Sequence, residues 1–429
     1  MARLARLALL AALVALAAAS PASAALLGHG GPVRGVAVSA DGRTAVTAGF
    51  DYSLIVWRLA NESMAARLVG HDAAVNAVAL GPEGHIAVSA SDDGSVGVWD
   101  LDAGRLVRRL RAGAKLGAVV LSPDGAQVAA GGWDGRVHRW RLADGATEPP
   151  LDNGGERVTA LAFVGGRLLA GGHEGSLRAW RAADGVQLLH LPAHDFGLTA
   201  LAVLPDGSLI TGSIDRSLRL WDLAAGEPRR GELVGHEQPV LALAASADGR
   251  LLASAGARGE VLVWDAGERQ VRSVLAGKGP PVWSLAFTPD GDRLLGGGAD
   301  GAVRVWDPTT GEALGAPIPV AVAETPAHGR GPELFAKCSA CHTLTDDGAH
   351  KAGPTLADLF GRRAGSLAGY PYSPALRRSG IVWTEATVAR LFEVGPDRMV
   401  PGTKMPLQRM PNARDRADLV AYLKRMSGG

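Results

Sequence analysis

Cysteine is almost absent from this chain, with two residues in 429. A disulfide scaffold is therefore excluded, and because Cys338 and Cys341 are three positions apart, we expect them to share one chemical role. Aromatic residues make up only 5% of the chain, and neither charge is in excess, since 44 Lys and Arg nearly balance 43 Asp and Glu. This balance argues against a basic nucleic-acid binder, so no nucleic-acid partner is expected.

The sequence also lacks an apolar run long enough to span a bilayer, which takes roughly 20 residues. The apolar stretch Leu7–Ala19 follows Arg3 and Arg6 and precedes the small residues Ala22–Ala24. This pattern is typical of a secretory signal peptide, so we expect residues 1–24 to be cleaved and no membrane span to remain. Only six of the 44 basic residues are Lys, a bias typical of GC-rich bacterial genomes, and the expected compartment is the periplasm.

Glycine, by contrast, is abundant, with 58 residues. Seven tryptophans recur 40 to 43 residues apart, and each closes a short alternating run such as Ser95–Trp99. A four-stranded sheet of about 40 residues cannot bury both of its faces alone, so packing around a ring is expected. Seven units predict a closed seven-bladed β-propeller. The repeated tryptophans are Trp57, Trp99, Trp140, Trp180, Trp221, Trp264 and Trp306.

Other residues recur with the same period. Five units have Asp six residues before the Trp, whereas Glu174 and Arg258 occupy that position in the other two. Four units open with a His that follows Gly or Ala, and four end in Trp-Asp. Residues 25–318 therefore resemble the WD40 repeat family. The resemblance implies buried hydrogen-bonded tetrads, which here are His29-Thr47-Asp51-Trp57, His71-Ser89-Asp93-Trp99 and His194-Thr211-Asp215-Trp221.

These histidines are interpreted as structural groups. Each recurs with the Asp and Trp of its own unit, so the side chains are distributed around the ring and do not converge on one metal or acid–base site. The propeller is therefore expected to be a platform for protein–protein contacts. The remaining propeller histidines have no repeated partner and are expected to be solvated on the surface: His85, His138, His173 and His190.

The repeat pattern ends after Trp306, and three prolines follow within residues 315–326. This composition predicts a semi-rigid connector, whose start is a candidate for the outer strand of the last blade. We place the propeller at 25–318, the linker at 319–328 and a second domain at 329–429. Because each part carries a complete pattern, the two domains are expected to fold independently.

The second domain contains Cys338-Ser-Ala-Cys341-His342. Two Cys three apart followed directly by His form the attachment signature of a c-type haem, in which both thiols bond to the haem and the His binds iron. The alternatives are a chance match, a thiol redox pair and a zinc site. A redox pair would need a parallel-sheet domain around it, and a zinc site would need two further ligands at comparable spacing. The expected export favours the haem.

The segment from about Gly331 to the C-terminus resembles class I cytochromes c of the cytochrome c2 and mitochondrial type. The resemblance implies an all-α domain with one covalent haem c, attached at Cys338 and Cys341 and ligated by His342 and Met405. The motifs that carry it are Leu334-Phe335-Ala-Lys-Cys338, Gly353-Pro354-Thr-Leu356, Leu359-Phe360-Gly361-Arg362, Gly369-Tyr370-Pro-Tyr372, Gly380-Ile-Val-Trp383, Pro401-Gly402-Thr403-Lys404-Met405 and Arg416-Ala-Asp-Leu-Val-Ala-Tyr422-Leu.

The same resemblance implies roles for further residues. The Pro354 carbonyl is expected to orient the His342 ring, and Phe335 is expected to pack against Tyr422 where the first and last helices cross. The residues expected to hold the haem propionates are Arg362, Tyr370, Tyr372 and Trp383.

Two residues depart from the family pattern. Leu376 and Leu391 stand where the mitochondrial proteins usually place a polar Asn and Tyr near the haem, so the hydrogen bonding around the Met ligand is expected to differ, with a shifted reduction potential. Met399 and Met410 flank Met405 and are interpreted as packing residues.

Iron with both His and Met ligands has no open position for a substrate, which favours electron transfer over bond-making catalysis. The sequence thus predicts an exported electron carrier with redox partner proteins, its propeller serving as the partner-binding platform. The alternative is an oxidoreductase whose propeller holds a substrate or second cofactor, with the haem as electron outlet. A redox or gas sensor is a third option, which requires the Met to leave the iron easily.

The balanced total charge is divided unequally along the chain. Residues 327–429 carry 15 basic and 9 acidic residues, a net charge of +6, whereas residues 25–326 carry 27 basic and 34 acidic residues, a net charge of −7. Lys337, Lys351 and Lys404 lie close in sequence to the haem motifs. They are expected to form a basic rim that steers the domain toward an acidic redox partner or toward the propeller.

Overall fold

A computed structural model of the chain describes residues 25–223, 229–277, 279–314, 330–339, 341–345, 353–370, 372–403, 405 and 408–427, except for the side chains of residues 230, 336 and 337. The expected signal peptide, the whole of the expected linker at 319–328, and the side chains of Lys337, Lys351 and Lys404 lie outside these residues. No helix within the described ranges is both long enough and apolar enough to cross a membrane.

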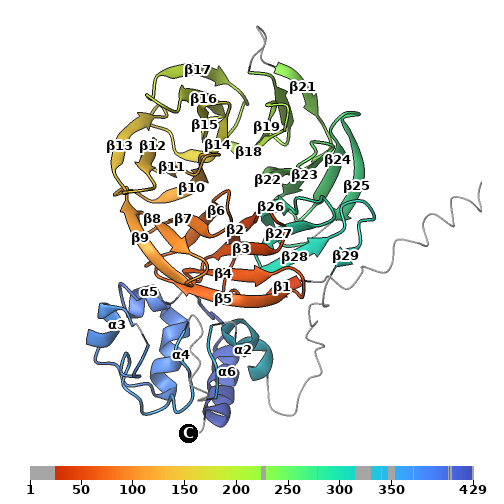
Figure 1. The fold of residues 1–429 in the computed structure, drawn as a ribbon. Helices are drawn as coiled ribbons and strands as arrows, with labels where there is room; N and C mark the ends of the chain where they lie inside the picture. The colour runs from red at the N-terminus through yellow and green to blue at the C-terminus, as the bar shows by residue number, and fades with distance from the viewer. Residues whose placement is uncertain are drawn as a thin grey trace, which may run out of the picture.

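Seven antiparallel sheets surround a common centre, which confirms the predicted seven-bladed propeller (Figure 1). In blades 1 to 6 the strands pair in chain order, so each blade is a meander. Blade 1 contains β2 (Val33–Val38), β3 (Thr44–Gly49), β4 (Ser53–Arg58) and β5 (Ser63–Val69); blade 2 contains β6 (Val75–Leu80), β7 (Ile86–Ser91), β8 (Ser95–Asp100) and β9 (Arg105–Arg111); blade 3 contains β10 (Leu116–Leu121), β11 (Gln127–Gly132), β12 (Arg136–Arg141) and β13 (Thr147–Asp152).

The next three blades repeat this arrangement. Blade 4 contains β14 (Val158–Val164), β15 (Arg167–Gly172), β16 (Ser176–Arg181) and β17 (Gln187–Pro192); blade 5 contains β18 (Leu198–Val203), β19 (Leu209–Ser213), β20 (Leu218–Trp221) and β21 (Arg229–Leu233); blade 6 contains β22 (Val240–Ala245), β23 (Leu251–Gly256), β24 (Val261–Asp265) and β25 (Gln270–Ala276). The second and third strands of each blade are buried almost throughout, because neighbouring blades cover both of their faces.

Blade 7 closes the ring with strands from both ends of the propeller. It contains β26 (Val282–Phe287), β27 (Leu294–Gly298) and β28 (Ala302–Trp306), and the outer edge of β28 is shared by β29 (Ala313–Leu314) and β1 (Ala25–Leu27). In β1, Leu26 pairs with Val303 and is buried in the core between blades 7 and 1. The outer strand therefore comes from β1 and β29, whereas residues 315–326, the sequence-based candidate, lie outside the described residues.

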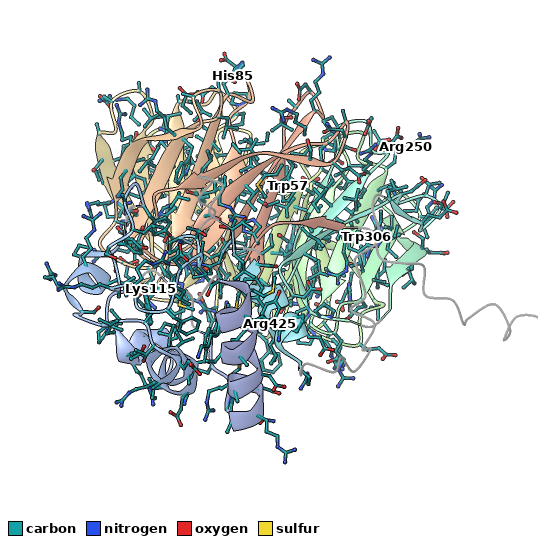
Figure 2. The ribbon with its side chains drawn as sticks, turned by 90° about the horizontal axis from the view of Figure 1, so that it is seen from below. Trp57, His85, Lys115, Arg250, Trp306 and Arg425 are labelled. Carbon is teal, nitrogen blue, oxygen red and sulfur yellow. The ribbon has the colours of Figure 1, made fainter. Side chains whose placement is uncertain are left out.

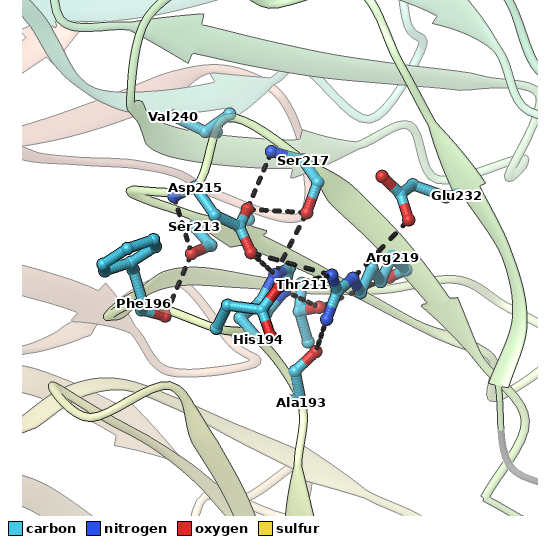
Figure 3. Close-up of polar contacts among 12 residues, drawn as sticks. Ala193, His194, Phe196, Thr211, Ser213, Asp215, Ser217, Arg219, Glu232 and Val240 are labelled. Atoms are coloured by element: carbon cyan, nitrogen blue, oxygen red, sulfur yellow. Dashed lines mark hydrogen bonds and ion pairs between the residues drawn. The ribbon is translucent and has the colours of Figure 1, made fainter.

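The three expected tetrads are confirmed, and blade 2 shows how one works. The Ser89 hydroxyl accepts a hydrogen bond from Trp99 Nε1 at 2.7 Å and lies 2.7 Å from His71 Nε2, while His71 Nδ1 lies 2.8 Å from Asp93. Blades 1 and 5 repeat these contacts with Thr47 and Thr211 as the hydroxyl. Figure 3 shows the blade 5 network, in which Ser217 and Arg219 also contact Asp215.

Three blades without an opening His neutralise the turn carboxylate in another way. The partner of the carboxylate is a His or Arg two residues before the Trp, on the third strand of the same blade. The pairs are His138 with Asp134 at 3.0 Å, Arg178 with Glu174 at 2.8 Å, and Arg304 with Asp300 at 2.6 Å. The prediction of a solvated His138 is therefore wrong, because its side chain is only 12% exposed, whereas His85, His173 and His190 are exposed as expected.

The pKa shifts of these groups fit a structural role. Burial would raise the pKa of Asp93, but its hydrogen bond with His71 and the charge of that ring lower it well below the usual range. Burial lowers the pKa of His194 and of His236, against the opposing effects of Asp215 and Glu260. These two rings are therefore mainly neutral at pH 7, each accepting a hydrogen bond from a buried hydroxyl.

The second domain lies beside blade 1 and is helical, as expected (Figure 1). Helices α2 and α6 pack together, and the rings of Phe335 and Tyr422 lie 5.6 Å apart at their crossing, which confirms the expected contact. Thr384 caps α4 through a reciprocal hydrogen-bonded box with Thr387. The described helices are α2 (Gly331–Ser339), α3 (Pro374–Arg378), α4 (Glu385–Val394), α5 (Pro396–Met399) and α6 (Ala413–Met426).

Replacing Ser89 with Ala should destabilise the propeller. The change leaves two buried groups, Trp99 Nε1 and His71 Nε2, without their shared partner, and an unpaired buried polar group costs about 1–3 kcal/mol. Urea unfolding followed by circular dichroism should show a lower midpoint. Ser89→Thr is the matched control, because Thr fills the same position in blades 1 and 5. An unchanged midpoint for Ser89→Ala would contradict the tetrad's role.

Candidate functional site

The Cys-x-x-Cys-His motif occupies the end of α2 and the turn that follows it. Both Cys341 N and His342 N donate to the carbonyl oxygen of Cys338, at 3.0 and 2.8 Å. This last turn gathers both sulfur atoms and the imidazole at one site, and both cysteines are buried. The helical start of the domain thus presents its three reactive side chains together.

The His342 ring is held by a backbone carbonyl. His342 Nδ1 lies 2.7 Å from the Pro354 oxygen, and because a carbonyl only accepts, Nδ1 carries the proton and Nε2 is left as the metal-binding nitrogen. Gly353 packs so closely against the imidazole that a Cβ at this position would overlap the ring. The φ angle of Gly353 is not left-handed, so close approach to His342, and not backbone conformation, calls for glycine here.

Met405 approaches the same pocket from a loop. Gly402, with φ of 83°, allows the turn in which Thr403 N donates to Val400 O, and Met405 N then lies 3.3 Å from the Thr403 hydroxyl. The Met405 side chain lines the pocket together with His342, whereas Met399 and Met410 do not line it. Met410 instead packs at the edge of the domain core.

All nine residues assigned to the site from the sequence line this one pocket. Most of the remaining wall is apolar, and it includes Leu376 and Leu391, the two departures from the family pattern. A pocket with few polar groups excludes water and suits a large, flat, mostly apolar cofactor. The nine residues are Cys338, Cys341, His342, Pro354, Arg362, Tyr370, Tyr372, Trp383 and Met405.

Several of the lining residues carry polar groups. Arg362 donates to the carbonyl oxygens of Ala357 at 2.9 Å and Thr355 at 2.7 Å, which fixes its guanidinium. The rings of Tyr370 and Tyr372 meet edge to face, with centroids 4.7 Å apart. Burial, with a smaller contribution from Cys341, raises the pKa of Tyr370 to about 12, so its hydroxyl stays protonated and can donate a hydrogen bond.

One residue of the pocket wall comes from the propeller. Asp51, in the turn between β3 and β4, lines the pocket together with Cys341. Burial would raise the pKa of Asp51, but the charge and hydrogen bond of His29 and the charge of Arg67 lower it well below the usual range. The prediction of two independent domains did not include this contribution of Asp51 to the pocket, because no sequence motif connects Asp51 with Cys341.

Comparison with known proteins agrees with this geometry. The cytochrome c family model matches residues 329–427, and the family model for the WD domain, G-beta repeat, matches six segments that together span more than half of the chain. The chain is a WD40-repeat protein with a cytochrome c domain. The six matched segments are 22–58, 63–100, 104–141, 185–222, 228–265 and 269–307.

Cytochromes c from several organisms are similar to the second domain alone. That of Gibberella zeae is 44% identical over 96 residues, which are 22% of this chain and 90% of that protein. Those of Gossypium barbadense and Chlamydomonas reinhardtii are 43% and 41% identical over 95 and 105 residues, 22% and 24% of this chain and 85% and 93% of those proteins. A cytochrome c domain implies covalently bound haem c, and the residues of the pocket fit this cofactor.

The family model leaves out the repeat that the structure shows as blade 4. This repeat lacks the opening His and has Glu174 in place of Asp. Its carboxylate is instead paired with Arg178, which also approaches Asn153 at 3.4 Å. A basic residue two positions before the Trp is the sequence signal that could have identified this pairing in the WD40 repeats without His.

Replacing Gly353 with Ala should weaken haem binding. The added methyl group would push the imidazole of His342 away from the Pro354 carbonyl. The haem content per protein, measured as pyridine haemochrome, should fall. Gly380→Asn is the control, because Gly380 has φ of 69°, which Asn tolerates, and open space around its Cβ position. A normal haem content and spectrum in Gly353→Ala would contradict the proposed contact.

Proposed function

We propose that this protein is an exported electron carrier. Its single haem c is bonded by Cys338 and Cys341 and ligated by His342 and Met405, and its propeller binds partner proteins. The observation that carries the proposal is the hydrogen bond from His342 Nδ1 to Pro354, in a pocket that Met405 and both cysteines also line. The haem supplies one-electron exchange between its ferrous and ferric states.

The pocket residues have separate tasks in this proposal. The Pro354 carbonyl orients the imidazole and increases its basicity, and Met405 offers a thioether, which favours ferrous iron. The apolar wall, including Leu376 and Leu391, excludes water from the iron. Arg362, Tyr370, Tyr372 and Trp383 line the pocket and would hold the propionates. With His342 and Met405 as its two protein ligands, the iron would have no open position for a substrate, which favours electron transfer over catalysis.

Export to the periplasm is part of this proposal. It is supported by the apolar stretch Leu7–Ala19 with its preceding arginines and by the small residues before Ala25. The redox partners would meet the protein outside the cytoplasm, where c-type haem is attached in bacteria.

Replacing Met405 with Ala should remove the weak ferric sulfur-to-iron band in the far red and lower the reduction potential, because ferrous iron loses its thioether ligand. Absorption spectroscopy and a potentiometric titration measure both effects. Met399→Leu and Met410→Leu are the controls, since neither residue lines the pocket. If either control removes the band while Met405→Ala keeps it, Met405 is not the ligand.

A second candidate function is favoured by a cationic and aromatic cluster on the propeller. Arg34 lies over the Trp283 ring at 4.5 Å, and Lys115 and Arg157 lie over the Trp133 ring at 5.2 and 4.8 Å. Arg34 Nε is buried without a hydrogen-bond partner within the described part of the chain. Burial and the charge of Arg157 lower the pKa of Arg34, against the effect of Asp92.

An anion would stabilise these crowded cations. We propose that the cluster binds a small organic anion, whose flat body packs on the indole rings and whose carboxylate faces the guanidinium groups. The cluster would be the ligand site of the propeller in the alternative function, an oxidoreductase with the haem as electron outlet. Lys115 also lines the cleft between the two domains, so the bound anion would lie on the side of the ring that the cytochrome domain contacts.

Calorimetric titration with benzoate as the probe tests this second function. The unmodified protein should bind benzoate, and Arg34→Met, which keeps an apolar stem on Trp283, should abolish binding. Arg250→Met is the control, because Arg250 is 83% exposed and lies well away from Lys115 in Figure 2. Absent binding, or equal binding by Arg34→Met, would exclude the site.

A further inference from the structure

The cytochrome domain meets the propeller at the edge of the pocket where Cys341 lies. Gly30, in the loop between β1 and β2, packs against Cys341 so closely that any Cβ at this position would overlap Sγ. Asp51, whose carboxylate accepts a hydrogen bond from Gly30 N at 2.9 Å, lines the pocket beside this contact. Blade 1 therefore covers the part of the site that holds the second cysteine.

The other repeats show that Gly30 departs from the pattern of its position. In the three other blades that open with a His, the next residue is acidic: Asp72, Asp195 or Glu237. The backbone does not require glycine, because φ of Gly30 is not left-handed and Asp72 N makes the same 2.9 Å hydrogen bond to Asp93. The absence of a side chain at Gly30 is what allows the close contact with Cys341.

Tyr52 departs from the pattern in the opposite direction. It is the third residue of the turn between β3 and β4, where five blades have glycine with φ between 75° and 95°. Tyr52 adopts φ of 66°, a left-handed conformation that is unfavourable for a bulky side chain. Strain of this kind persists where the side chain has another role.

The surroundings of Tyr52 indicate that role. Tyr52 lines the cleft between the domains, together with Phe392 and Met410 of the cytochrome domain. Burial, Asp92 and then Asp397 of α5 raise the pKa of Tyr52, which places a cytochrome carboxylate within electrostatic range. Similarly, the charge of Arg67 in β5 acts on Tyr370. Blade 1 thus has a glycine where the three other blades that open with His have an acidic residue, and a tyrosine where five blades have glycine. Both residues face the cytochrome domain.

We propose that blade 1 is a docking surface for the protein's own cytochrome domain, and that docking closes the Cys341 edge of the haem to outside redox proteins. This inference rests on the proposed electron-carrier function. A cleft of about 1530 Å³ remains between the domains beside the contact, so the docked patch is limited and can separate. Electron exchange with a partner protein then requires the domain to leave blade 1.

The first test replaces Gly30 with the aspartate that blades 2 and 5 have at the equivalent position. Gly30→Asp creates the His-Asp sequence of blades 2 and 5. Arg67 can donate to the new carboxylate as Arg109 donates to Asp72 at 3.2 Å, so the propeller should fold. The aspartate cannot fit against Cys341. Small-angle X-ray scattering should show a larger radius of gyration. Oxidation of the reduced variant by azurin should be about fivefold faster or more, the range of a typical coupling between sites.

Gly31→Ala is the neighbouring control. A Cβ at Gly31 would meet Phe50 Cβ at 3.4 Å, and among the three nearest atoms none belongs to the cytochrome domain. This variant should keep the scattering profile and the azurin rate of the unmodified protein. An equal expansion in Gly31→Ala and Gly30→Asp would overturn the proposal, because the effect would then belong to the loop and not to the Cys341 contact.

Tyr52→Gly provides a second, independent variant. Glycine relieves the left-handed strain, so the propeller should unfold at an equal or higher urea concentration while the domains separate. Arg216→Gly is the matched control, because Arg216 has φ of 75° at the same turn position of blade 5 and should stabilise the ring without separating the domains. A compact Tyr52→Gly protein with an unchanged azurin rate would overturn the role of Tyr52.

The scattering profile, the azurin rate and the haem spectrum together distinguish a failure of the docking surface from a failure of the proposed function. If both blade 1 variants keep the scattering profile and the azurin rate of the unmodified protein while their haem spectra are normal, the docking surface is refuted and the electron carrier stands. If the unmodified protein lacks a covalently bound, six-coordinate haem, the proposed function itself fails.

Discussion

The ring depends on one electrostatic constraint, which is that each blade places a carboxylate at the same end of its middle strands. The carboxylates of blades 1, 2, 5 and 6 are largely buried, and those of blades 3, 4 and 7 are about one-third exposed. A carboxylate without a partner is costly in such a place, so every blade supplies a cation or hydrogen-bond donors for it. Blades 1, 2, 5 and 6 use a His that precedes the first strand, and blades 3, 4 and 7 use a basic residue two positions before the Trp. The seven blades therefore share a paired carboxylate, but the residue that pairs with it differs between blades.

In blade 1 this same carboxylate borders the functional site. Asp51 accepts hydrogen bonds from His29, Gly30 and Arg67 on the propeller side, and it lines the pocket that contains Cys341 and His342 on the other. A group that the ring needs for stability thus becomes part of the environment of the haem. Because the network around Asp51 is fully occupied, its charge is fixed, and the cytochrome domain meets a rigid surface.

Much of this arrangement was visible in the sequence. The tryptophan period predicted seven blades. The short motifs, including those around Cys338, Pro354 and Met405, identified nine site residues because each motif is local in the sequence, and all nine line one pocket. The features that the sequence did not reveal depend on contacts between residues that no motif connects. The pairing of β1 with β28 leaves no trace in a strand of three residues, and His138 was misjudged because its Asp partner follows a different spacing. Gly30 and Tyr52 stand out only when the blades are compared at equivalent turn positions.

The closure of the ring has a consequence for the order of assembly. β1 pairs with residues 302–304, so it finds its partner only when the last blade has been made, and such distant pairings form slowly. The loop that carries Gly30 follows β1 directly and is held in position by that pairing. The cytochrome domain, which follows the propeller in the chain, therefore finds its place on blade 1 only when the ring is complete. Docking of the cytochrome domain on blade 1 therefore requires that both the ring and the cytochrome domain have folded.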